Sequence, residues 1–385
     1  MKERIPTILF EKRLSRSRKA TVLVPILSFV LALVFGGLIL LAFGINPLEA
    51  YSVMVQGSLG SGYALTETLV KAIPLMLTGL GVSIAFRMLF WNIGAEGQLA
   101  WGGIAAAFVA LFLSDSLPGF TLIPLMMILA ILAGALWALI PAALKAWIGV
   151  NEILTTLMMN YIAILMVEYL YHGPWRDPEG YGFPGSAIFP DAAWLPRLTG
   201  RVHIGLIFAI LAAALIWFIL NRTRWGYEIR VIGENPKAAR YAGMSIARNI
   251  ILVMLLSGGL AGLAGMAEVS GITHRLYHGL TVGTGYTAII VAWLAALNPW
   301  GVLVVAFLMA ALQVGGDQIQ IALGLPAAVA GVLQGANLFF VLGGSIFVNY
   351  RVRFIRPEKE ATEGPIDDGR TPQAPESATA GGSHD

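Results

Sequence analysis

Long apolar runs separated by short polar stretches dominate this sequence. Most runs approach the roughly 20 residues that a helix needs to cross the hydrocarbon core of a bilayer. Because lipid offers no hydrogen-bond partners to an open backbone, such runs must be helical. The runs are Thr21–Phe43, Glu67–Phe86, Gly97–Leu113, Thr121–Trp147, Glu152–Tyr171, Ile204–Leu220, Asn249–Ala267, Tyr286–Leu297, Trp300–Gln318 and Ala327–Tyr350. The pattern predicts an all-α, polytopic membrane protein with about ten transmembrane helices.

Some parts of this pattern are irregular. Tyr286–Leu297 is too short to cross a bilayer, so we expect a broken or half-crossing helix there. Glycine and proline interrupt the apolar sequence around Leu48–Gly62 and Trp91–Gln98, where we expect similar breaks. Between Ser257 and Gly265, small residues recur four apart, which predicts close helix packing.

Basic residues set the predicted orientation, because short cytoplasmic loops retain lysine and arginine. Those before the first run are Lys2, Arg4, Lys12, Arg13, Arg16, Arg18 and Lys19. Counting forward from a cytoplasmic start leaves both termini in the cytoplasm. The predicted parts are a basic cytoplasmic arm at 1–20, a transmembrane domain at 21–350 with an external loop at 172–203 and a cytoplasmic loop at 221–248, and a cytoplasmic tail at 351–385. The tail is acidic and poor in large apolar residues, so we expect it to be disordered.

Composition supports the membrane prediction and excludes several functions. The chain is 57% hydrophobic and 12% charged, and its net charge of +3 implies no nucleic-acid partner. It contains no cysteine, so disulfides, thiolate metal sites and a cysteine nucleophile are excluded. No lysine follows a glycine, so the chain lacks a phosphate-binding loop for ATP. We therefore expect no cofactor, metal or enzyme activity in this chain.

Polar side chains inside the apolar runs are candidates to line a translocation pathway, because such groups at membrane depth usually face a bundle interior or water. The candidates are Asn92, Glu96, Gln98, Asn151, Glu152, Asn160, Gln313, Asp317 and Gln334. Amides offer donors and acceptors, which suits a neutral, hydroxyl-rich solute. The alternative is that these amides only join helices. Glu67 and Lys71 stand four residues apart in the order that favours a pair within one helix.

The loop 221–248 has an organised pattern. Asn235 and Pro236 predict the start of a short helix, and Gly243 is placed to end it. This segment, 233–243, and two others, 90–98 and 149–161, resemble the membrane permease of bacterial ATP-binding-cassette (ABC) importers. The resemblance is to the branch that serves ribose-type sugars, branched-chain amino acids and nucleosides, and the segment 149–161 is most similar to the nucleoside importers.

The resemblance implies a type II-like importer permease of the bacterial inner membrane. In that family the short cytoplasmic helix docks into the ATPase subunit, which implies a coupling role for Gly233, Asn235, Pro236, Ala238, Ala239, Tyr241 and Gly243. The implied partners are ATPase subunits that use ATP, a second and shorter permease, a substrate-binding lipoprotein and the lipid bilayer. A nucleoside or related ribosyl solute is the expected cargo. The alternatives are a simple sugar such as ribose, a secondary transporter that needs no partner, and a membrane scaffold.

Overall fold

The computed structural model describes residues 7–12, 18–325 and 350–355, together with short helical pieces at 331–332, 335–336, 339–340 and 343–344. Its α-helices are α1 (Arg18–Ala42), α2 (Pro47–Leu59), α3 (Gly62–Arg87), α4 (Ala95–Phe112), α5 (Gly119–Ala143), α6 (Glu152–His172), α7 (Gly205–Arg222), α8 (Arg224–Glu234), α9 (Pro236–Tyr241), α10 (Ile246–Glu268), α11 (Thr284–Leu294) and α12 (Pro299–Leu323). Short π-helical segments, Leu144–Ile148 and Val269–Thr273, extend α5 and α10. The protein is therefore mostly helical, as its sequence predicts.

Seven helices of the described part of the chain are long and apolar enough to cross a membrane: α3, α4, α5, α6, α7, α10 and α12. An eighth span is possible if Val30–Ala42 and α2, which meet at a bend of 115°, count as one. Both lie in regions where the sequence predicts a span or a break. The expected number of about ten is not reached within these residues, and the last predicted run, Ala327–Tyr350, lies largely outside them.

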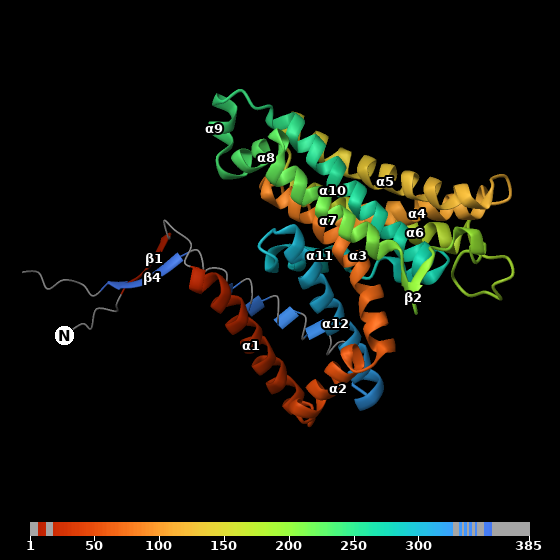
Figure 1. Ribbon diagram of the computed structural model, residues 1–385, viewed down its shortest axis with the longest axis horizontal. Coiled ribbons are helices and arrows are strands. Elements are labelled where there is room, and N and C mark those ends of the chain that lie inside the picture. Colours follow the sequence, from red (N-terminus) through yellow and green to blue (C-terminus); the bar gives the residue numbers. More distant parts are fainter. Residues whose placement is uncertain are drawn as a thin grey trace, which may run out of the picture.

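Helix α10 lies at the centre of the bundle, against α3, α4 and α5 (Figure 1). The small residues predicted to pack closely do so. A Cβ atom on Gly262 would lie 2.1 Å from the carbonyl oxygen of Ala130 in α5, and one on Gly102 in α4 would lie 2.1 Å from the carbonyl oxygen of Gly262. Backbone therefore contacts backbone at the core of the molecule, where a larger side chain has no space.

Helix α11 has 11 residues. At 1.5 Å per residue it is about 16 Å long, roughly half the thickness of a hydrocarbon core. This agrees with the half-crossing helix predicted from the short apolar run. The chain before it, from His274 to Gly283, is irregular apart from a single turn at His278–Leu280. The stretch from Met88 to Gly94, between α3 and α4, is likewise non-helical.

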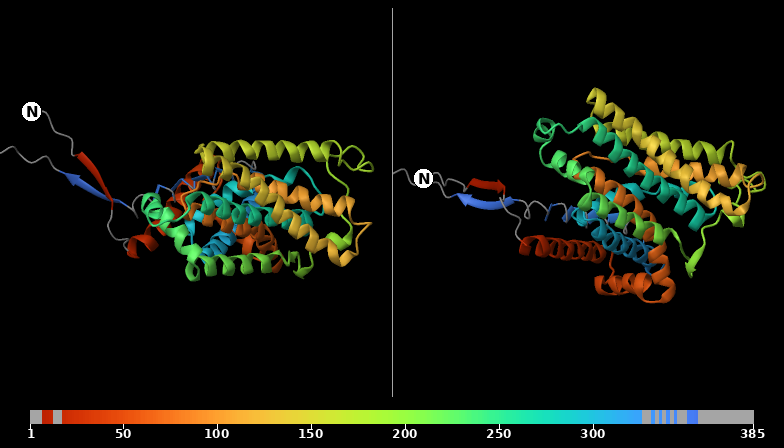
Figure 2. Two further views of the ribbon diagram at one scale, coloured as in Figure 1. Left: turned by 90° about the horizontal axis from the view of Figure 1, so that it is seen from above. Right: turned by 45° about the horizontal axis from the view of Figure 1, so that its top comes forward.

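Two short pairs of strands depart from the all-α prediction. In the loop predicted to be external, β2 (Arg197–Thr199) pairs with β3 (Val202–His203). At the termini, β1 (Thr7–Lys12) pairs antiparallel with β4 (Tyr350–Ile355), in a register that runs from Thr7 opposite Ile355 to Lys12 opposite Tyr350. Figure 2 shows this pair projecting away from the helical bundle. This pairing joins two segments that lie near opposite ends of the sequence. The predicted disorder of 351–385 concerns residues that, beyond Ile355, lie outside the described part.

Candidate functional site

A network of buried amides connects the irregular stretch before α4 to α10. Asn92 Nδ2 donates hydrogen bonds to Gln98 Oε1 and to Ser257 Oγ, each at 3.0 Å. Gln98 Nε2 donates in return to Asn92 Oδ1 at 3.0 Å, and the backbone N–H of Gly94 donates to the same oxygen at 3.1 Å. All three side chains are buried. The donors and acceptors of Asn92 therefore bind to other parts of the same chain.

Asn160 joins α6 to the same region. Its Oδ1 accepts the backbone N–H of Gly97 at 2.8 Å. Its Nδ2 donates to the carbonyl oxygen of Ile93 at 2.8 Å and to the hydroxyl of Tyr286 at 3.1 Å. One amide thus contacts the stretch before α4, α4 itself and α11.

The carboxylate of Glu96 binds the start of α11. Its side chain is buried near the start of α4. Oε1 accepts the backbone N–H of Gly283 at 2.8 Å, and Oε2 accepts the backbone N–H of Gly285. A negative charge at a helix N-terminus is favourable, because the first N–H groups of a helix lack partners within it. Glu96 therefore holds the half-length helix in place.

Asn92, Glu96, Gln98 and Asn160, with Ser257 and Tyr286, are called the polar clamp below. The structure brings these four predicted pathway residues together, and in this conformation their hydrogen-bonding atoms are used between helices. That arrangement is what the helix-joining alternative predicts. Ser257 and Tyr286 were not predicted as site residues, because a serine in a small-residue stripe and a tyrosine near a helix start carry no distinct signal.

The remaining pathway candidates lie apart from the polar clamp's hydrogen bonds. Asn151 caps α6 by accepting the backbone N–H of Ile153 at 2.9 Å. Glu152 forms an ion pair with Lys145 at 2.7 Å. On α12, Gln313 is half-buried and Asp317 is exposed. Gln334 lies outside the described residues.

The predicted coupling helix is present as α9. Asn235 caps it, since Oδ1 accepts the backbone N–H groups of Lys237 at 3.0 Å and Ala238 at 3.1 Å. Pro236 occupies its first turn, and Gly243 follows its end with a φ of +77°. Helices α8 and α9 lie at one end of the bundle, and β2 lies at the opposite end (Figure 1).

The residues predicted to couple to an ATPase differ in what they can contact. Ala239 is fully buried, so it holds α9 against its own chain, whereas Tyr241 is 93% exposed. Gly233 in α8 packs so closely on α3 that a Cβ atom there would meet the carbonyl oxygen of Arg87. Arg87 donates from Nε and Nη2 to the carbonyl oxygen of Leu297, just after α11, at 3.2 and 3.0 Å. The α8–α9 segment is thus tied to the C-terminal ends of α3 and α11.

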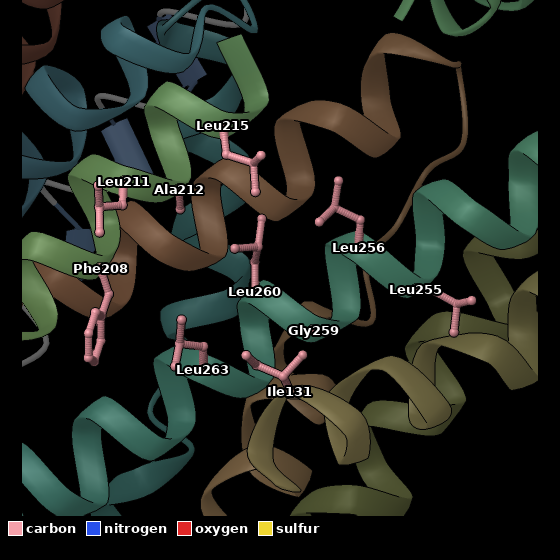
Figure 3. A pocket seen from close by; sticks show the side chains of 10 residues that line it. All are labelled: Ile131, Phe208, Leu211, Ala212, Leu215, Leu255, Leu256, Gly259, Leu260 and Leu263. Carbon is pink, nitrogen blue, oxygen red and sulfur yellow. The ribbon is translucent and has the colours of Figure 1, made fainter. Parts of the chain in front are cut away.

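Cavities of two kinds occur in the described part of the chain. A groove of about 310 Å³ between α5, α7 and α10 is lined by apolar side chains such as Phe208, Leu256 and Leu260 (Figure 3). A second apolar cavity, of about 450 Å³, lies between α2 and α12. A third, of about 570 Å³, lies between α2, α3 and α12, and charged side chains line it. We call this third space the charged cavity; the residues that give it this name are Glu67, Lys71 and Asp317.

Glu67 does not pair with Lys71 as its spacing suggests. It forms an ion pair with Arg201 at 2.8 Å, in the turn between β2 and β3. The loop 172–203 folds onto the N-terminal part of α3, and a pattern within one helix cannot reveal a partner from so distant a segment. Lys71 is exposed on α3.

Comparison with known proteins identifies the class of protein to which this chain belongs. The chain belongs to the family described as branched-chain amino acid transport system / permease component, whose match spans residues 64–342. It functions as the permease subunit of an ABC importer. It is 39% identical to the glucose ABC transporter permease protein TsgB13 of Haloferax volcanii, over 89% of this chain and 92% of that protein.

Two further relatives are similar over nearly their full length. The guanosine ABC transporter permease protein NupP of Bacillus subtilis is 36% identical, over 88% of this chain and 96% of that protein. The nucleoside ABC transporter permease protein NupB of Lactococcus lactis is 33% identical, over 85% of this chain and 92% of that protein.

Proposed function

We propose that the protein forms one half of a membrane pathway that carries a nucleoside or related ribosyl solute inward. One observation carries this proposal. Over most of its length this chain is 36% identical to a permease named for guanosine and 33% identical to a permease named for nucleosides. The relative at 39% identity is named for glucose, which favours a simple sugar as the second candidate.

The proposed complex contains partner ATPase subunits, a second permease and a substrate-binding lipoprotein. Support for a second permease comes from the fact that this chain resembles two guanosine ABC transporter permease proteins of Bacillus subtilis. One is NupP, and the other is NupQ, which is 30% identical over 61% of this chain. ATP is used by the ATPase subunits, so this chain contributes no cofactor site of its own. The complex lies in the bacterial inner membrane.

We place both termini in the cytoplasm. The pairing of β1 with β4 supports a common side for the two ends. The basic residues of the 1–20 arm favour the cytoplasmic side, because positive residues flanking a span stay there. The same orientation puts α8 and α9 in the cytoplasm, where an ATPase subunit can bind them.

Within this proposal α9 transmits movement from the ATPase. Its exposed face carries Ala238 and Tyr241, which are available to a partner, while Ala239 anchors the helix. The contacts of Gly233 with Arg87, and of Arg87 with Leu297, support a mechanical connection from α8 and α9 to α11. The polar clamp then fixes the other end of α11 beside the pathway.

Reconstitution tests the function. The complex of both permeases and the ATPase, with the binding protein added, is placed in proteoliposomes, and ATP hydrolysis is measured with guanosine, ribose or glucose. We expect guanosine to stimulate hydrolysis and to accumulate with ATP. Stimulation by glucose or ribose alone would replace the nucleoside with a sugar. Uptake by vesicles that hold only this chain would indicate a secondary transporter instead.

A further inference from the structure

Two charged side chains are exposed within spans of the bundle. Lys71 lies nine residues into α3 and Asp317 six residues before the end of α12. At 1.5 Å per residue these positions are about 13 Å and about 9 Å from the helix ends. A charge that faces hydrocarbon is costly, so charges within spans normally face protein or a water-filled space. The face that carries both residues is therefore not a lipid-facing surface.

Both residues line the charged cavity, which opens between α2, α3 and α12. Its volume of about 570 Å³ is within the range of small-molecule sites, roughly 300–1,000 Å³. Close approach of α2 and α12 forms its wall, since a Cβ atom on Gly57 would lie 2.4 Å from Gln318. Gln56 and Gln318 add amides to the lining. The cavity is thus a built space with polar side chains.

The charges of the cavity are only partly neutralised by the chain itself. Glu67 is paired with Arg201. No carboxylate in the described part of the chain lies within ion-pair distance of Lys71, although Glu268 attracts it electrostatically at longer range. Among the same residues, Asp317 has no ion pair and its carboxylate no hydrogen bond. An ammonium with three donors and a carboxylate with acceptors only therefore remain available in one cavity.

These groups define the chemistry of a ligand. A carboxylate accepts hydrogen bonds from two hydroxyls at once, and an ammonium donates to a carbonyl or ring nitrogen. Because one positive and one negative group are available, a neutral solute with hydroxyls at one end and acceptors at the other matches the lining. A nucleoside has this division, with a vicinal diol on its ribose and acceptors on its base.

We propose that the charged cavity is a solute-binding station of the permease, where Asp317 accepts hydrogen bonds from a vicinal diol and Lys71 donates to the opposite end of the solute. This rests on the proposed function. The ion pair of Glu67 with Arg201 ties one wall of the station to the external loop, which places it toward the outer end of the pathway.

Single cysteines test whether water and solute reach the station. The chain has no cysteine, so Ile321→Cys on α12 and Tyr63→Cys on α3 each introduce a unique thiol, at exposed positions that line the cavity but make neither of the assigned contacts. A charged, membrane-impermeant thiol reagent is applied to the reconstituted complex, and the mass of this subunit is followed. We expect both thiols to react, and guanosine at saturating concentration to slow the reaction about tenfold or more, as a bound ligand at ten times its Kd occupies most sites. Val304→Cys is the matched control, because Val304 is also exposed on α12, at 61%, but lies outside the cavity; we expect no labelling there.

The possible outcomes test the solute-binding station and the proposed function separately. Absence of labelling at position 321 would mean that a partner subunit fills the cavity, and would overturn the station. Suppose that guanosine still stimulates ATP hydrolysis by the complex, but neither guanosine nor ribose slows the labelling. That result would overturn the station and leave the proposed function standing. If no nucleoside stimulates ATP hydrolysis by the wild-type complex, the proposed function is overturned instead. If both ribose and guanosine protect the thiols from labelling, the station recognises the diol. If guanosine alone protects them, binding at the station also requires the base.

Charge removal tests the assigned contacts. For Asp317→Asn and Lys71→Met, we expect the half-saturating guanosine concentration for uptake to rise about 10-fold to 100-fold, the usual effect of losing a hydrogen bond to a charged group. The wild-type complex should prefer guanosine to 2′-deoxyguanosine, and Asp317→Asn should reduce that preference because an asparagine has only one oxygen to accept from the diol and carries no charge. Gln320→Ala, at an exposed position on the same helix outside the cavity, should behave as wild type. Equal preference for both nucleosides in wild type, or unchanged half-saturation in both variants, would contradict the proposal.

Discussion

The contact of Glu96 with the start of α11 predicts that removing the charge of this side chain destabilises the protein. Glu96→Gln keeps the shape of the side chain but removes its charge. The carboxylate accepts two backbone N–H groups, from Gly283 and Gly285. A glutamine has one oxygen and one NH₂ group, so one of the two backbone donors must face another donor. The substitution therefore breaks one hydrogen bond without opening a cavity.

The magnitude follows from these two contacts. Loss of one hydrogen bond to a charged group costs about 1.5–3 kcal/mol. Loss of a buried negative charge at a helix N-terminus adds up to about 2 kcal/mol. We expect Glu96→Gln to lower the free energy of unfolding by about 2–5 kcal/mol. Glu152→Gln is the matched control, because Glu152 also begins a helix but forms a partly exposed ion pair with Lys145, worth about 1 kcal/mol or less.

Two measurements check this prediction. Thermal unfolding of the purified subunit in detergent should show a melting temperature lowered by several degrees for Glu96→Gln and little changed for Glu152→Gln. Hydrogen exchange should accelerate in the peptide that contains 283–294, because the start of α11 loses its partner. The assigned role of Glu96 would be refuted by a Glu96→Gln variant that has the melting temperature of wild type and whose 283–294 peptide exchanges hydrogen no faster.

Three further predictions follow from other parts of the molecule. Tyr241→Ala should reduce ATP-driven uptake and leave the melting temperature unchanged, because the side chain is 93% exposed on α9; unchanged uptake would remove Tyr241 from the coupling contact. Gly262→Val should prevent accumulation of folded protein in membranes, because its Cβ atom would lie 2.1 Å from backbone, whereas Gly62→Ala, with nothing within 4 Å, should accumulate normally. His203 is buried, and burial with nearby His274 lowers its pKa to about 4, so the stability that its neutral form contributes is complete above pH ~6.5 and is lost as the pH falls toward 4, by about 3 kcal/mol. Melting temperatures measured across that range for wild type and His203→Gln check this, and parallel curves would contradict it.

The helices were the most predictable part of the fold. Apolar runs of suitable length fix where a chain crosses a membrane, so α3, α5 and α6 begin and end within a few residues of the predicted runs. The short run that became α11 was also predictable, because length alone excludes a full crossing. By contrast, β1 and β4 pair across almost the whole length of the chain, and no local pattern specifies that pairing.

The candidate site was predictable in its residues but not in its contacts. Asn92, Glu96 and Gln98 stand out in the sequence because they are polar within apolar surroundings. Their partners, the hydroxyl of Ser257 and the backbone N–H groups before α11, are common groups without a sequence signal. Glu67 shows the same limit, since its spacing to Lys71 fits a helix pair but Arg201 from another segment is the actual partner.

The glycine contacts around α10 restrict how the molecule can move. A Cβ atom on Gly81 in α3 would lie 2.6 Å from the carbonyl oxygen of Ser257, and one on Gly134 in α5 would lie 2.2 Å from that of Gly258. Flexible side chains at an interface can absorb small sliding motions, but touching backbones cannot. We therefore expect helices α3, α4, α5 and α10 to move as one unit, so that the relative displacements of a transport cycle arise outside these backbone contacts.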